Sequence, residues 1–288
     1  MQPSFSVQKR PSNTSTSSKF GLKDECPKGT VPILRMTKER QLRNESSFAN
    51  DFKASASGLE VGVSTVPDNT KKYHGAGGVV TTAMVPVQNG QFSASVISIE
   101  GGPPEEFGSI SVGWMQGVNG AMHGCYDTDC PGFVLVTSSI PPNVVVYDGS
   151  DRPESHVFLK FNITQDAITG NWWFELGDDA GEVNQIGYWP SSLFTNLKDG
   201  ADVLRWGGMV YSNKPESPPM GSGGEDCYFW GLTLADPGAA PGSDSSTAPL
   251  EKSESRCYRV GEDDSFKPEF FGYSFWFGGP GGDTNQCH

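Results

Sequence analysis

The sequence predicts an all-β protein, a sandwich of two curved antiparallel sheets. The 288 residues include 36 glycines and 21 prolines, a composition typical of many short strands joined by turns. From Tyr73 onward, short apolar runs alternate with polar residues in the period of two that marks strands. A single large all-β domain is ordinary at this length. We therefore expect one domain over residues 73–288 and a polar extension over residues 1–72.

Eleven strands are expected in order along the domain. The first two, residues 78–85 and 92–99, flank residues 88–91, where the Asn-Gly pair is typical of a hairpin turn. The other nine are short apolar or alternating runs bounded by turn residues: 109–115, 133–137, 157–164, 171–176, 185–189, 204–211, 227–234, 256–260 and 273–277. This number of strands suits two packed sheets.

Two further segments are expected to lie outside the strands. One short helical turn is predicted over residues 191–199, after Pro190, where Ser191 or Ser192 could cap it and spaced apolar residues give it one apolar face. Residues 235–253 are rich in Ala, Pro, Gly and Ser and are expected to form a surface loop.

The charge of the chain limits its partners. A formal net charge of −13 and a pI near 4.7 leave no general basic surface, so nucleic acid and anionic membranes are excluded as expected partners. No apolar run reaches the length of a membrane span. The sequence also contains no Walker, Rossmann, GxSxG or HExxH motif. We expect no cofactor, no metal and a monomer.

The most distinctive stretch is residues 170–208, which contains four tryptophans in short glycine-bounded runs. The motifs GNWW at 170–173, IGYWPSSLF at 186–194, WGG at 206–208 and MGSG at 220–223 resemble the neprosin family of plant glutamic peptidases. The resemblance extends from Glu25 to Cys287. It implies a curved sheet that forms a cleft, and a hydrolase, a prolyl endopeptidase that cuts proteins after proline in acid.

The resemblance also suggests a role for the N-terminal extension. Residues 25–35, ECPKGTVPILR, resemble the end of the family's prosegment. Residues 1–72 are thus expected to be a prosegment remnant and linker, mostly disordered, and the alternative is an ordinary extension with no regulatory role. The family implies an extracellular or cell-wall location. Because residues 1–18 are polar and lack the apolar run of a secretory signal, we expect an incomplete form of the precursor.

Six cysteines and three sequons fit an exported glycoprotein. Cys125, Cys130, Cys257 and Cys287 match positions where the family has cysteines, so the resemblance implies the disulfides Cys125–Cys130 and Cys257–Cys287. A zinc site is disfavoured because His123 is the only histidine near either pair. Cys26 and Cys227 either pair with each other or stay as thiols. The sequons begin at Asn13, Asn44 and Asn162, and Asn44 and Asn162 are the predicted glycosylation sites.

The family's two catalytic glutamates are replaced in this chain. One belongs to a Glu-Ala-Gly-Trp motif, matched here by Ser111-Val-Gly-Trp114, and the other follows Trp-Gly-Gly, where this chain has Met209. Such a mechanism needs one ionised carboxyl to activate water and one protonated carboxyl to polarise the scissile carbonyl. A hydroxyl without a base and a thioether supply neither. We expect the chain to be catalytically impaired, a pseudoenzyme.

Other residues could still bind a ligand or replace the lost acids. The candidate ligand-binding residues are Trp114, Trp206, Glu175, Tyr188 and Trp189; the aromatic ones could bind proline or sugar by ring stacking. Strand alternation places Glu175 on the same face as Trp173, which makes it the first acid to examine. The other candidate acids are expected to be solvated: Glu100, Glu105, Glu106, Glu225 and Asp226.

Three functions are consistent with these residues. The first is an impaired neprosin-like protein that binds proline-rich peptide or cell-wall material, either glycoprotein or polysaccharide. The second is an active acid endopeptidase with altered catalytic residues. The third is a carbohydrate-binding sandwich. Fold resemblance alone does not decide among them.

Overall fold

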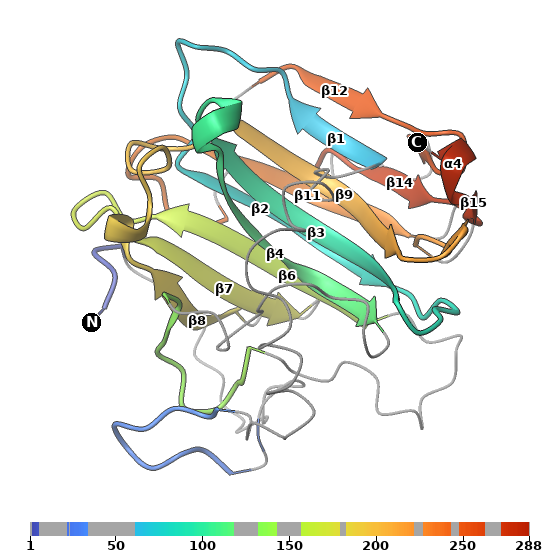
Figure 1. Ribbon diagram of the computed structural model, residues 1–288. Coiled ribbons are helices and arrows are strands. Elements are labelled where there is room, and N and C mark those ends of the chain that lie inside the picture. The colour runs from blue at the N-terminus through green and yellow to red at the C-terminus, as the bar shows by residue number, and fades with distance from the viewer. Residues whose placement is uncertain are drawn as a thin grey trace.

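The computed structural model describes ten segments of the chain, which are residues 2–5, 22, 24–33, 61–117, 132–142, 157–178, 183–221, 227–242, 248–262 and 272–287. They form two large antiparallel sheets packed face to face, as Figure 1 shows. The predicted all-β sandwich is confirmed. No helix in these segments is long and apolar enough to cross a membrane.

The smaller sheet has five strands in the order β12-β1-β9-β3-β4. Their bounds are β1 (Val61–Thr65), β3 (Gln91–Gly101), β4 (Gly108–Gly117), β9 (Val203–Ser212) and β12 (Leu250–Ser253). Strand β3 lies between β4 and β9 over almost its whole length, and β4 is an edge strand (Figure 1). This sheet therefore holds both strands that carry the family's catalytic positions.

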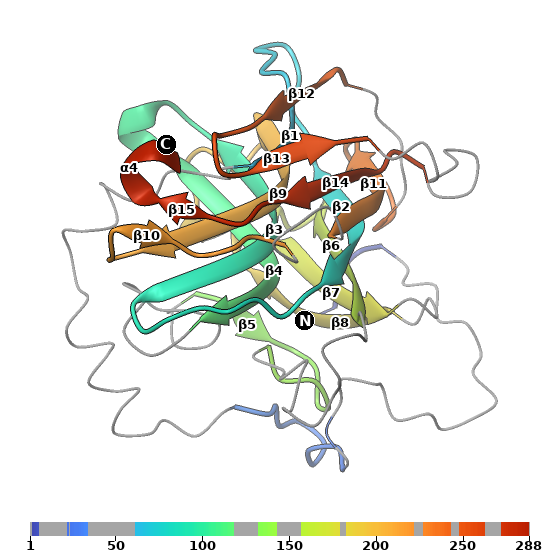
Figure 2. The ribbon, with the colours of Figure 1, turned by 90° about the vertical axis from the view of Figure 1, so that its right-hand side faces the viewer.

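The larger sheet has eight strands in the order β13-β14-β11-β2-β6-β7-β8-β5. They are β2 (Gly75–Thr82), β5 (Val134–Leu135), β6 (Val157–Gln165), β7 (Trp172–Asp178), β8 (Val183–Trp189), β11 (Tyr228–Ala235), β13 (Arg259–Gly261) and β14 (Phe275–Gly278). Figure 2, turned by 90°, shows β2, β6 and β11 of this sheet to the right of β3, β4 and β9 of the first. A two-stranded ribbon and three short helical elements complete the described fold: β10 (Glu216–Ser217), β15 (Gly282–Asp283), η1 (Pro104–Glu106), η3 (Ser191–Leu193) and α4 (Thr284–Cys287).

The core lies between the two sheets and contains two fully buried tryptophans with satisfied indole groups. Trp206 on β9 donates its indole N–H to the carbonyl of Gly77 on β2, 2.9 Å away, and so joins the sheets by a hydrogen bond. Trp172 on β7 donates to the carbonyl of Leu197 at 2.9 Å. Buried indole N–H groups need such partners, and of these two contacts the Trp206–Gly77 bond connects one sheet to the other.

All eleven predicted strands correspond to observed strands, but the predicted hairpin is wrong. Strand β2 pairs with β6 and β11, whereas β3 pairs with β4 and β9, so the two strands belong to different sheets. The turn itself is present. Gln91 donates its N–H to the carbonyl of Gln88, and Gly90 has a φ of +87°, which glycine adopts without strain. The turn leads the chain from one sheet to the other.

Four strands were not predicted. Strand β1 lies in the predicted linker, β12 lies in the predicted loop over residues 235–253, and β10 and β15 are short. Strands β1 and β12 pair with each other. Each therefore has a hydrogen-bonding partner strand that its own sequence does not reveal. The described sheet therefore begins at Val61, before the predicted boundary at residue 73.

The predicted helical turn is shorter than expected. Only η3 forms, and no side chain caps it. The Ser191 hydroxyl instead donates to the carbonyl of Thr169 in the preceding loop. Three residues form too short a helix for the expected apolar face, and the chain continues through bends to Gly200.

The disulfide between Cys257 and Cys287 is confirmed. It ties the C-terminal helix α4 to the segment before β13. Cys26 and Cys227 are thiols that do not pair with each other, and the Cys227 thiol donates to the carbonyl of Thr81. The predicted pair Cys125 and Cys130 lies outside the described residues.

Parts of the N-terminal extension contact the larger sheet and the loop beside it. The backbone N–H of Ser4 donates to the carboxylate of Asp166, and the ring of Phe5 lies edge-on to Trp173. Farther along, Leu22 and Cys26 donate backbone N–H groups to Ser139 and Ser138. The described pieces of this extension are therefore packed against the domain.

Candidate functional site

The two positions that carry the family's glutamates lie on the same face of the five-stranded sheet. On β3, Ile97 and Ile99 point into the core, so the alternate residues Ala94, Val96 and Ser98 point to the outer face. Ser98 pairs with Ser111 on β4, and Ala94 pairs with Met209 on β9. Because paired residues share a face, Ser111 and Met209 both point outward.

A row of three glycines and one valine runs across the sheet between these two positions and beyond. Between them lie Gly113 on β4, Val96 on β3 and Gly207 on β9, and the row continues to Gly62 on β1. We call these four residues the glycine strip. Ser111 and Met209 are two strands and four residues apart, roughly 10 Å across the strands and roughly 14 Å along them. Gly113 is exposed, whereas Gly207 and Gly62 are buried. A peptide backbone can approach a sheet most closely over such glycines.

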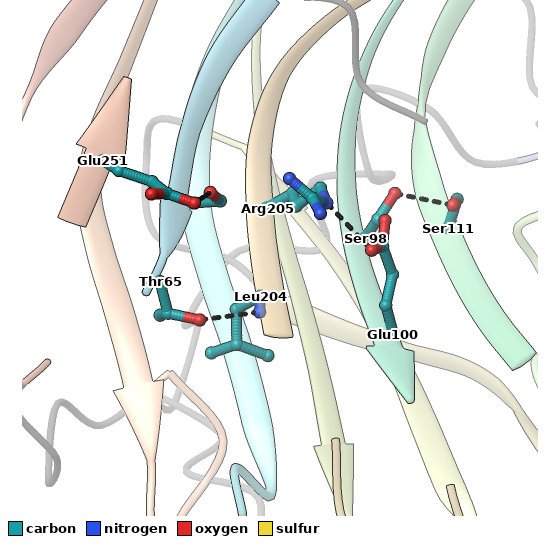
Figure 3. Close-up of polar contacts among 8 residues, drawn as sticks. Thr65, Ser98, Glu100, Ser111, Leu204, Arg205 and Glu251 are labelled. Carbon is teal, nitrogen blue, oxygen red and sulfur yellow. Dashed lines mark hydrogen bonds and ion pairs between the residues drawn. The ribbon is translucent and has the colours of Figure 1, made fainter. Parts of the chain in front are cut away.

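One side of the glycine strip is a polar row, shown in Figure 3. The hydroxyl oxygens of Ser98 and Ser111 lie 2.7 Å apart and share a hydrogen bond. In the same row, Arg205 donates from Nε to the carboxylate of Glu100 at 2.8 Å. The Glu100 side chain is 9% exposed and that of Arg205 is 29% exposed, so this ion pair is partly shielded from water.

The other side of the strip is apolar. Ala94 and Val96 form a small buried cluster with Phe92 and Met209, separate from the main core. The rings of Phe92 and Tyr211 stack with their centroids 5.7 Å apart. Met115, opposite Ala94, is 37% exposed. The outer face thus offers hydroxyls and a guanidinium on one side of the strip and aromatic and thioether groups on the other.

The carboxyls on this outer face do not form a catalytic pair. Glu100 is held by Arg205, and Glu251, which accepts a hydrogen bond from Ser64, stands on β12. Strands β1 and β9 separate β12 from β3, a distance of roughly 14 Å. Because the Glu100 carboxylate is already paired with the Arg205 guanidinium, these two acids are not arranged to share one water. Among the described residues of this face, no second acid faces Glu100.

The sequence profile of the Neprosin family matches residues 89–280, which is more than half of the chain. The chain belongs to the neprosin family. The matched region begins at the turn before β3 and includes Ser111, Met209 and three residues of the glycine strip. Strands β1 and β2 precede the matched region, although β1 supplies Gly62 to the same face.

The two tryptophans next to these neprosin positions point away from the glycine strip. Trp114 is three residues from Ser111, and Trp206 is three residues from Met209, so each pair faces opposite sides of its strand. Trp206 is 0% exposed and reaches Gly77 of the other sheet. Trp114 is partly buried and packs against the main core. In this structure the indole of Trp206 has no surface that a ligand could contact.

The other predicted binding residues lie on the larger sheet. Glu175 on β7 and Tyr188 on β8 share its outer face with Trp173, as strand alternation predicted for Glu175. Trp189 lies on the inner side, with its ring against Phe133 and Phe174. The five predicted binding residues therefore do not converge on one site.

Glu175 is the buried acid of the larger sheet, with 3% of its surface exposed. Burial raises its pKa, and this effect is opposed by the Asn162 amide, the positive charge of Lys160 and the Gln185 amide. Its side chain lies on the opposite sheet from Ser111 and Met209, so it cannot complete their lost dyad.

The remaining predicted residues can be placed briefly. Asn162 is 3% exposed and sits in the middle of β6, which argues against a glycan on the folded chain at this sequon. Glu105 and Glu106 are exposed in η1. Asn13, Asn44, Glu225 and Asp226 lie outside the described residues. In the described segments, no three His, Cys, Asp or Glu side chains gather as metal ligands would.

Proposed function

We propose that this neprosin-family chain is a catalytically impaired member that binds a proline-rich peptide across the glycine strip. The observation that carries the proposal is the replacement of both glutamate positions, Ser111 and Met209, on either side of a strip in which three of the four residues are glycines. Neither position supplies the acid or the base that the family's mechanism needs.

Impairment follows from the chemistry of the two replaced positions. The Ser111 hydroxyl is hydrogen-bonded to Ser98, another hydroxyl, so it has no base to accept its proton. Met209 packs in an apolar cluster and has no proton to give. Loss of one acid or base group typically lowers a rate by about 10² to 10⁴. Loss of both removes the means to activate water.

Peptide binding follows from the two sides of the strip. A proline-rich peptide in the polyproline II conformation leaves its carbonyls free of internal hydrogen bonds, and these can accept from Ser111 and Arg205. Its proline rings are apolar and can pack on Met115, Met209 and Phe92. Aromatic and apolar surfaces next to hydrogen-bond donors are the usual recognition mode for such chains.

An extracellular or cell-wall setting fits this proposal. The Cys257–Cys287 disulfide is of the kind that persists in oxidising compartments. The partner would then be a proline-rich or hydroxyproline-rich cell-wall glycoprotein, bound by a monomer. Cell-wall polysaccharide is the alternative partner for the same setting.

Catalytic impairment is tested by an acid digestion assay on a proline-rich protein at pH 4, near the reference pKa of glutamate. The native chain is compared with Ser111→Glu/Met209→Glu and with the matched control Ser111→Gln/Met209→Gln. The native chain and the Gln control should leave the substrate intact, whereas the Glu variant should cleave it after proline. Cleavage by the native chain would instead support an active acid endopeptidase with altered residues. A folded but silent Glu variant would refute the assignment of the two positions.

Peptide binding is tested separately by titrating a fluorescent proline-rich peptide. Met115→Arg places a bulky charge beside the strip and should weaken binding at least tenfold. The control is Ile168→Arg, which changes an 82% exposed residue in a loop of the other sheet and should leave binding unchanged. Equal affinity of both variants would exclude the strip as the binding site.

A further inference from the structure

Four unpaired polar atoms meet on the outer face of the eight-stranded sheet. In the described part of the chain, the buried side-chain atoms without a hydrogen-bond partner are Asn162 Oδ1, Trp173 Nε1, Glu175 Oε1 and Gln185 Nε2. Glu175 on β7 pairs in register with Asn162 on β6 and with Gln185 on β8. Trp173 is two residues from Glu175 and shares its face. The four side chains are therefore neighbours.

These unpaired atoms are costly unless something pairs with them. A buried donor or acceptor left unsatisfied destabilises the fold, and most such groups in native proteins have a partner. Two members of the cluster are hydrogen-bonded to each other, since the Asn162 amide donates from Nδ2 to the other oxygen of Glu175 at 3.4 Å. Of the four atoms, the two nitrogens are donors and the two oxygens are acceptors. The Gln185 amide lies near enough to the Glu175 carboxylate to lower its pKa, so Asn162 Oδ1 and Trp173 Nε1 are the two atoms that most need an outside partner. A hydroxyl group, which both donates and accepts, is their natural complement.

An aromatic pair lies next to this cluster. The rings of Trp173 and Tyr188 are 4.8 Å apart at an angle of 34°, and both residues lie on the outer face of the sheet. Flat aromatic surfaces bind the apolar face of a sugar ring, while side-chain amides and carboxyls bind its hydroxyls. Aromatic rings, amides and a carboxyl are combined here within two adjacent rows of one sheet.

The chain itself covers this face in the structure. Phe5 lies edge-on to Trp173 with ring centroids 6.4 Å apart, and Ser4 is anchored to Asp166. On the other side, Gly242 lies over Asn162, where even a Cβ atom would come within 3.1 Å of the amide oxygen. Trp173 is consequently 1% exposed and Tyr188 8% exposed. Phe5 therefore covers the Trp173 side of the cluster, and Gly242 covers the Asn162 side.

We propose that the outer face of the eight-stranded sheet, built from Asn162, Trp173, Glu175, Gln185 and Tyr188, is a saccharide-binding site that Phe5 closes. A sugar hydroxyl pairs with the polar cluster, and the sugar ring stacks on the aromatic pair after Phe5 leaves. This site lies on the opposite sheet from the glycine strip, so it does not depend on whether the strip binds peptide. A single water molecule could offer the same hydroxyl chemistry, and the experiment separates the two.

The test titrates the full chain with cellohexaose and follows binding by calorimetry. Phe5→Ala removes the cover and should bind at least threefold more tightly than the native chain. Adding Trp173→Phe, which keeps an aromatic ring but removes the indole donor, should weaken that binding at least tenfold. Trp189→Phe on the inner side of the same sheet is the matched control and should leave the affinity of the Phe5→Ala chain unchanged.

Two results would overturn the proposal. One is a folded Phe5→Ala chain, with native near-ultraviolet circular dichroism, that binds no cellohexaose. The other is binding that Trp173→Phe leaves unaltered. A high-resolution crystal structure of the non-binding chain with one water bonded to all four atoms would then identify the cluster as a water site only. Ser111→Glu/Met209→Glu should retain native saccharide binding, which keeps this test separate from that of the glycine strip.

Discussion

Removal of the Cys257–Cys287 disulfide should lower the stability of the domain by several kcal/mol. The bond closes a loop with a sequence separation of 30 residues. In the chain-entropy description, the entropy that such a loop removes from the unfolded state corresponds to about 3.6 kcal/mol at 25 °C. The perturbation is Cys257→Ala/Cys287→Ala, which avoids placing a hydroxyl at the buried position of Cys287.

The assay is urea unfolding followed by tryptophan fluorescence, with and without reductant. The double variant should lose about 3.6 kcal/mol of unfolding free energy at an unchanged slope, and the native chain should lose a similar amount when reduced. Cys26→Ala, which removes a thiol that forms no disulfide, is the control and should change little. A loss below about 1 kcal/mol in the double variant would refute the loop-entropy reasoning for this bond.

Three further predictions concern buried polar contacts. Trp206→Phe removes the indole donor to Gly77 and should lower the free energy of unfolding, measured in urea, by about 1–3 kcal/mol. Trp189→Phe, at a half-buried position, should lower it less. Burial alone raises the pKa of Asp166, but hydrogen bonds from Ser4 and Thr169 outweigh it and lower the pKa to about 2. The ionised Asp166 should therefore stabilise the fold fully above pH 4, and this stabilisation should disappear as the pH falls through about 2. In Asp166→Asn, the free energy of unfolding should depend less on pH between 2 and 4. The pKa of Glu175 is raised by burial, so native stability should fall as the pH rises above about 4.5, and Glu175→Gln should remove this fall.

The strand pattern was predictable because local composition carries it. Glycine, proline and alternation of apolar residues mark where each strand begins and ends, and all eleven predicted strands were found. Pairing is not local, so the Asn-Gly turn at residues 89–90 indicated a reversal of the chain but not that β2 and β3 enter different sheets. Strands β1 and β12 were missed for the same reason. Their sequences, VGVST and LEKS, form strands because they pair with each other.

The candidate site was only partly predictable. The motifs matched Ser111 and Met209 to the family's glutamate positions, but not their place on one face of one sheet. Trp114 and Trp206 were expected beside them, although residues three apart on a strand face opposite sides. The alternation of side chains along a strand could by itself have excluded Trp114 and Trp206 from the face that carries Ser111 and Met209. The glycine strip was not predictable, because Gly62, Val96, Gly113 and Gly207 become neighbours only through the register of four strands. The same holds for the polar cluster around Glu175.

The place of β1 in its sheet also bears on how the protein folds during synthesis. The ribosome releases β1 early, yet its partners β9 and β12 follow about 140 and about 190 residues later at about 5–20 residues per second. For roughly 7–30 s, Val61 and Val63 have neither neighbouring strand to pair with. The sheet that carries Ser111 and Met209 is complete only after β12 has been translated, and until β9 or β12 is available β1 is an unpaired strand of the kind that can pair with another chain.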